Sequence, residues 1–103
     1  MSAKIAEVKG KNGAYATLEQ AFGQTLLAWR KKRGLSQMDL AVASGYSLRY
    51  IGDIERGVKS ATLRTMHDLA TLLDVRLSVL IIEAELLWKR DLNATHPSPR
   101  SKR

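Results

Sequence analysis

The sequence predicts a compact all-α domain of five helices, flanked by flexible N- and C-terminal arms. Apolar residues recur at helical spacing in several segments, and residues 36–57 have the pattern of two short helices joined by a tight turn. The 103 residues are 45% hydrophobic and 26% charged, which is enough apolar material for one packed domain.

Both ends of the chain are basic and poor in apolar runs. Residues 1–16 are rich in Lys, Gly and Ala and predict a flexible arm, with a small hairpin between residues 5–8 and 14–17 as the alternative. Residues 89–103 contain both prolines of the chain and predict a basic disordered tail. The two arms carry most of the net charge of +7, so the charge alone is weak evidence for DNA binding.

Residues 17–33 form the first predicted helix. Thr17 and Gln20 have the spacing of a capping box, and Gly34 suits the end of the helix. One face is apolar: Leu18, Phe22, Leu26 and Trp29.

Residues 36–57 predict the next two helices. Ser36 and Asp39 suit the start of the first, Gly45 suits a left-handed turn, and Ser47 caps the second. Two short helices joined in this way form a helix-turn-helix, whose second helix has the width of a DNA major groove.

The last two predicted helices are residues 63–73, capped by Thr62, and residues 77–88. The second of these is ambiguous, because Val79 to Ile82 also fits a short strand; we favour the helix. It holds more apolar residues than one buried face needs. We therefore expect a dimer or partner surface there, the alternative being that these residues cover the domain's own core. The surface comprises Leu77, Ile81, Ile82, Leu86 and Trp88.

Several of these residues, at fixed offsets, resemble the phage repressor/Cro-type (XRE-type) helix-turn-helix DNA-binding proteins. They are Gly34-Leu35-Ser36-Gln37, Leu40-Ala41, Gly45, Ser47, Tyr50-Ile51 and Ile54-Glu55-Arg56-Gly57. The likeness extends from about Phe22 to Leu80. It implies a five-helix, lambda-repressor-like domain at residues 17–88 that binds double-stranded DNA as a homodimer, without a cofactor.

The resemblance also implies roles for individual residues. Gln37 would touch the DNA backbone and sometimes a base. Arg56 and Lys59 would contact phosphates, and Arg30 and Glu55 would form a partly buried structural ion pair. The groove-facing positions of the second motif helix would be Leu48, Arg49, Gly52 and Asp53. With Ser47 and Tyr50, the predicted DNA-binding set is Gln37, Ser47, Leu48, Arg49, Tyr50, Asp53, Arg56 and Lys59.

Physical chemistry narrows these roles further. Arg49 can donate two hydrogen bonds to guanine, although a phosphate contact or a solvated charge would be the alternatives. Gly52 and Asp53 depart from the longer polar side chains frequent in the family. Gly52 cannot read a base, and Asp53 could accept from cytosine or pair within the helix with Arg49 or Arg56.

The sequence therefore predicts a non-enzymatic homodimeric transcriptional repressor, located in the cytoplasm on the nucleoid. One alternative is an antitoxin that autoregulates its operon and binds a toxin protein through an arm, and another is an interaction module that has lost DNA binding. No nucleophile–base pair, phosphate loop or metal cluster stands out, and cysteine is absent. No apolar run has the ~20 residues that a membrane helix needs.

Overall fold

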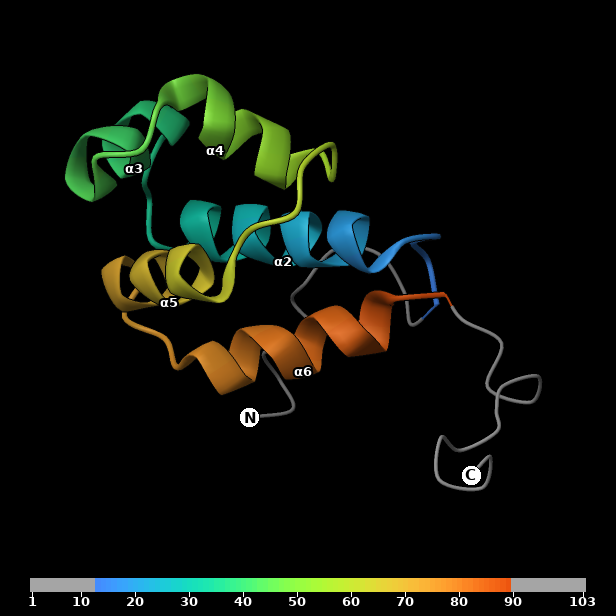
Figure 1. Cartoon of the computed structure of the whole chain (residues 1–103). Helices are drawn as coiled ribbons and strands as arrows, with labels where there is room; N and C mark the ends of the chain where they lie inside the picture. The colour runs from blue at the N-terminus through green and yellow to red at the C-terminus, as the bar shows by residue number, and fades with distance from the viewer. Residues whose placement is uncertain (1–12, 90–103) are drawn as a thin grey trace.

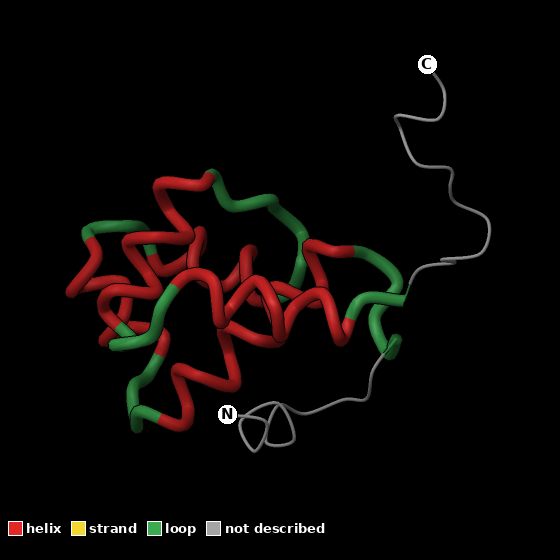
Figure 2. The backbone as a smooth tube through the Cα atoms, turned by 90° about the horizontal axis from the view of Figure 1, so that it is seen from below, coloured by secondary structure: helices red, strands yellow, loops and turns green. Residues whose placement is uncertain are grey.

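The structure is a computed structural model that describes residues 13–89. These residues form five α-helices joined by loops, without a named strand (Figures 1 and 2). The helices are α2 (Leu18–Lys32), α3 (Gln37–Ser44), α4 (Leu48–Glu55), α5 (Leu63–Leu72) and α6 (Leu77–Leu87). The predicted all-α class is confirmed, and the strand alternative for residues 77–88 is wrong.

The helix ends follow from local sequence. The predicted capping boxes are both present, Thr17 with Gln20 at α2 and Ser36 with Asp39 at α3. Gly45 ends α3 with φ = 84°, a left-handed conformation that a residue with a side chain rarely adopts. The helix-turn-helix is thus defined by residues that satisfy backbone groups at its boundaries.

Helix α2 is the central element of the fold. It packs against α4 on one side and against α6 on the other (Figure 1). Gly23 allows the approach of α4, because a Cβ at this position would lie only 2.2 Å from the carbonyl oxygen of Ile54. The core is built from apolar residues of every described helix: Ala21, Phe22, Leu26, Trp29, Leu40, Ala41, Ile51, Ile54, Leu69, Ala70, Leu73, Leu80, Ala84 and Leu87.

The segment before α2 is attached to the end of α6. The backbone N–H of Gly13 donates to the carbonyl of Leu86 at 3.0 Å, and that of Tyr15 donates to the carbonyl of Leu87 at 2.9 Å. Tyr15 and Trp88 form an isolated parallel bridge. This end of the predicted N-terminal arm therefore packs on α6, while residues 5–8 of the hairpin alternative lie outside the described residues.

A buried carboxylate connects α2 and α6. Trp29 Nε1 donates a 2.8 Å hydrogen bond to Glu83 Oε1, and Glu83 is almost fully buried. Arg33 lies over the Trp29 ring and donates from Nε to the carbonyl oxygen of Leu73 at 2.7 Å. Polar groups thus help to hold α2 against both α5 and α6.

Candidate nucleic-acid interface

Helix α4 has one buried face and one outward face. Ile51 and Ile54 are buried in the core. Arg49 and Arg56, which are seven residues apart, lie on the outward stripe with residues 52–53 between them. A face of this kind, on a short helix supported from behind by α2 and α3, is available to enter a DNA groove.

Arg49 is the single basic residue within α4. Its side chain is 87% exposed, and its only described ion-pair contact is with Asp53, at 3.9 Å from Nε to Oδ2. Leu48, also exposed, precedes it, and Ser47 uses its hydroxyl to cap the helix by accepting from the N–H of Tyr50 at 3.0 Å. Arg49 therefore keeps almost all of its donors for a ligand.

Asp53 is buried beneath a group of cations. Its side chain is only 8% exposed, and Oδ1 accepts from Arg56 Nη2 at 2.6 Å. Lys59 Nζ lies 3.7 Å from Oδ2, on the side where Arg49 approaches. The Asp53 carbonyl also accepts from the N–H of Val58, which draws the loop after α4 back onto the helix. This geometry favours the intramolecular role for Asp53 over contact with cytosine.

Arg30 and Glu55 form a buried ion pair between α2 and α4. Arg30 Nε and Nη2 donate to the two oxygens of Glu55 at 2.6 Å and 3.1 Å. Arg30 Nη1 donates to the carbonyl of Leu35 at 2.8 Å, and Gln37 Nε2 donates to Glu55 Oε1 at 2.8 Å. The sequence did not indicate this link to Gln37, which orients its side chain at the start of α3.

Tyr50 is partly buried and already has a partner. Its hydroxyl lies 3.4 Å from Thr65 Oγ1, and its ring packs edge to face against Tyr46 at 5.5 Å. The Tyr46 hydroxyl donates to Asp68 Oδ2 at 2.6 Å, and this hydrogen bond raises the pKa of Tyr46 above its usual value. The tyrosine pair thus connects the helix-turn-helix to α5.

The predicted partner surface divides into two parts. Leu77, Ile81 and Trp88 are partly buried against the core, as the core-covering alternative expects. Ile82 is 53% exposed, and Leu86, one turn further along α6, is half-buried. The apolar surface left for a partner is therefore centred on Ile82 and Leu86.

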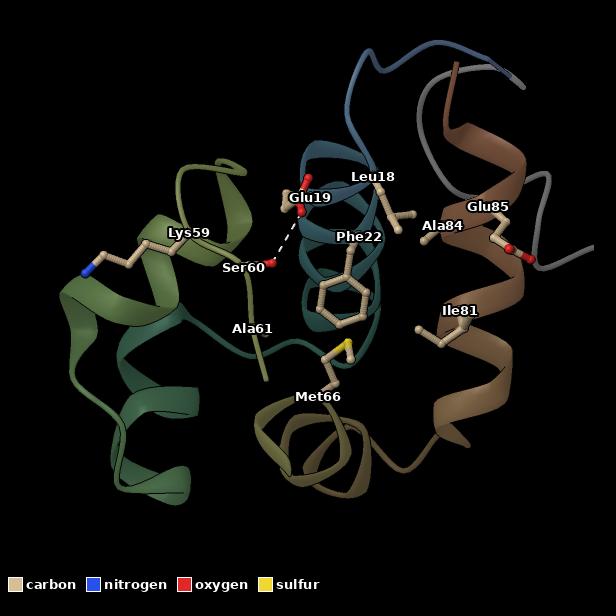
Figure 3. A pocket seen from close by; sticks show the side chains of 10 residues that line it. All are labelled: Leu18, Glu19, Phe22, Lys59, Ser60, Ala61, Met66, Ile81, Ala84 and Glu85. Carbon is tan, nitrogen blue, oxygen red and sulfur yellow. Dashed lines mark hydrogen bonds between the residues drawn. The ribbon is translucent and has the colours of Figure 1, made fainter. Parts of the chain in front are cut away.

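A cavity of about 170 Å³ lies between α2, α5, α6 and the loop after α4. Phe22, Met66 and Ile81 face its interior in Figure 3, whereas the charged end of Lys59 points away from it. At one edge the Ser60 hydroxyl donates to Glu19 Oε2 at 3.3 Å. The cavity is mainly apolar, and Ile81 forms part of its lining.

Other classes of site find no support in the part of the chain that the structure describes. No group of three or more His, Asp or Glu side chains is placed to hold a metal ion among residues 13–89. Within the same residues, no helix is both long and apolar enough to cross a bilayer.

Comparison with known proteins agrees with this geometry. A family model described as "Helix-turn-helix" matches residues 26–80, more than half of the chain. An uncharacterised HTH-type transcriptional regulator of Sinorhizobium fredii is 31% identical over 58 residues, which are 56% of this chain and 75% of that protein. The immunity repressor protein of Bacillus phage phi105 is 35% identical over 65 residues, 63% of this chain but only 45% of the repressor.

A solved structure shares the fold as well. The clp gene regulator ClgR from Corynebacterium glutamicum aligns with a TM-score of 0.66 at 28% identity, over 68% of this chain and 90% of that chain. The five-helix architecture and the resemblance to phage repressors are therefore confirmed. These relatives are transcriptional regulators and a repressor by name, which agrees with the expectation of a non-enzymatic protein and lends no support to the antitoxin alternative.

Proposed function

Because the chain belongs to the helix-turn-helix family of DNA-binding transcriptional regulators, we propose that it is a sequence-specific repressor that binds double-stranded DNA as a homodimer. The observation that carries the proposal is the outward face of α4. It presents the 87%-exposed Arg49 beside Arg56 and Lys59, and the buried Asp53 keeps these cations together.

In this mechanism α4 enters the major groove from its N-terminal end. Arg49 donates to a guanine edge, while Lys59 contacts a phosphate from the loop after the helix. Glu55 orients the Gln37 side chain at the start of α3, and the second N–H of the Gln37 amide remains available for the DNA backbone. Domain residues 17–88 make these contacts, and the basic arms add affinity that does not depend on sequence.

Two substitutions separate these roles. Arg49→Ala is expected to relax specificity at one base position, whereas Lys59→Ala weakens binding to all duplexes alike and lowers the salt slope by about 1. Arg76→Ala is the control, because Arg76 is an exposed arginine at the start of α6, away from α4. Selection of bound duplexes from a random pool, followed by titrations at several salt concentrations, measures each effect. A wild-type protein that binds specific and scrambled duplexes equally would refute sequence-specific binding, and one that binds neither duplex would favour the lost-DNA-binding alternative.

The homodimer is proposed through α6. Since α2 lies between α4 and α6, a partner on Ile82 and Leu86 leaves the outward face of α4 uncovered (Figure 1). A two-fold dimer should place its half-sites about 10 bp apart.

Ile82→Glu tests the dimer, because it introduces a charge at the centre of the exposed apolar surface. The variant should be monomeric in sedimentation experiments, while Val42→Glu, an exposed apolar residue of α3, leaves the mass unchanged. Equal masses for Ile82→Glu and wild type at every concentration would contradict an interface on α6.

A further inference from the structure

The space above Gly52 on the outward face of α4 is occupied by Arg56. A Cβ built on Gly52 would lie 3.0 Å from Arg56 Nη1 and 3.6 Å from both Cζ and Nη2. The Arg56 side chain therefore folds back along the helix by one turn. It covers the position at which a longer side chain would otherwise face the groove.

Asp53 holds this conformation. Its buried carboxylate accepts from Arg56 Nη2 at 2.6 Å, while the Arg56 side chain stays 61% exposed. A guanidinium has five N–H donors, and one of them is directed at Asp53. The other four N–H donors have no described acceptor, so two of them on neighbouring nitrogens can still make a bidentate contact.

We propose that Arg56 reads a base edge in the major groove, in place of the side chain that Gly52 lacks, and that Asp53 is the residue that positions it. The inference rests on the proposed DNA-binding function and assigns to Arg56 a specificity role rather than a phosphate contact. The base is a guanine, because its O6 and N7 acceptors match the two-donor edge of an arginine. Arg49 then reads a separate base pair, one helical turn away along α4.

Because Asp53 already holds the Arg56 side chain before DNA binds, the contact between Arg56 and the base is more selective. A free arginine loses rotamer entropy when it docks, whereas a guanidinium already held by Asp53 loses less of it on binding. The same hydrogen bond limits the directions in which Arg56 can donate, so a mismatched base cannot be accommodated by a change of rotamer. Gly52 and Asp53 thus act together, one by leaving space and the other by fixing the occupant.

Gly52→Ala tests the space without disturbing the fold. The atom that the new methyl group meets is the end of a flexible side chain, and alanine is a better helix former than glycine, so the thermal midpoint should not fall. Displacement of Arg56 should reduce discrimination at one base pair by about ten-fold, within the range that a bidentate contact supplies.

Arg56→Lys tests the reader itself. It keeps the positive charge but loses the planar fork, so discrimination should fall at the same base pair while the salt slope is unchanged. Asp53→Asn should weaken discrimination at that position too, because the amide attracts the guanidinium less strongly. Arg76→Lys is the matched control and should leave the whole specificity profile intact.

The measurement is the binding profile over all single-base variants of the selected duplex, with circular dichroism to check that each variant is folded. If the wild type is selective but its Arg56→Lys variant keeps full discrimination at every base pair, this inference alone is refuted. Arg56 would then be assigned a phosphate contact. A wild type without any preferred duplex would refute the proposed function and, with it, this inference.

Discussion

Removal of the Glu55 carboxylate should destabilise the domain more than the loss of any surface ion pair. In Glu55→Ala, the Arg30 guanidinium remains between α2 and α4 with its side chain only 9% exposed. It loses both donors to Glu55 and keeps only its 2.8 Å bond to the carbonyl of Leu35, while Gln37 also loses its acceptor. A buried charge without its counterion is the costly state.

The magnitude follows from this burial. Breaking a buried pair on one side costs about 3–5 kcal/mol, and a domain of this size has about 5–15 kcal/mol of stability in total. Each kcal/mol shifts the midpoint of thermal unfolding by about 4–8 °C in a domain of 60–100 residues, so the expected decrease is about 12–40 °C. By contrast, Arg64→Ala removes the exposed pair with Asp68, 3.9 Å long, and should cost at most about 1 kcal/mol.

Urea unfolding followed by far-ultraviolet circular dichroism measures the free energies for Glu55→Ala, Glu55→Leu, Arg30→Met and the double variant Arg30→Met/Glu55→Leu. The double variant should be more stable than Glu55→Ala, since two apolar side chains of similar volume leave no charge unpaired. A double variant as unstable as the sum of the two single changes would refute the argument. A loss below about 1 kcal/mol in Glu55→Ala would refute it as well, because the pair would then behave as a surface contact.

Three further changes test the packing around α2 and the start of α3. Gly23→Ala should destabilise the domain by about 2–3 kcal/mol, because the new methyl group meets the backbone of α4. The midpoint of urea unfolding measures this loss, and an unchanged midpoint would contradict the close approach of the two helices. Glu83→Ala leaves the N–H of Trp29 buried without its acceptor and should cost about 1–3 kcal/mol in the same assay, whereas a stabilised variant would count against the hydrogen bond. The Ser36 backbone amide lowers the pKa of Asp39 below its ordinary 3.8, so the stability from the ionised carboxylate is complete above pH 3.8 and is lost as the pH falls through the lower folded value. In Asp39→Asn, acid unfolding should lack this loss of stability below pH 3.8. Identical acid unfolding curves for the variant and the wild type would exclude a contribution from the Asp39 carboxylate.

The features that could be predicted from sequence are those decided within a few residues. A capping box satisfies donors within one turn, and the left-handed Gly45 ends α3 through its own backbone freedom. Each of these has a recognisable residue at a fixed offset. For this reason the helix-turn-helix and most helix starts agree with their predicted positions.

The remaining features depend on contacts between distant residues. Glu83 is buried because α6 places it against Trp29, 54 residues earlier in the chain, and a glutamate in an apolar segment has no local sign of such a partner. The pairing of Tyr15 with Trp88 is equally remote. The strand alternative for residues 77–88 also arose from local propensity alone, which the packing of α6 on α2 overrides.

The outward face of α4 shows why the candidate site was harder to predict than the fold. Taken one position at a time, Gly52 has no side chain to read DNA, and Asp53 repels phosphate. In the structure the two positions share their space with Arg56, which lies over Gly52 and is bonded to Asp53. Their spacing of three and four residues was the available signal, since such residues are neighbours on a helix surface. In the mechanism that we propose, Gly52, Asp53 and Arg56 act as one unit beside Arg49, so related chains should be compared at these three positions together.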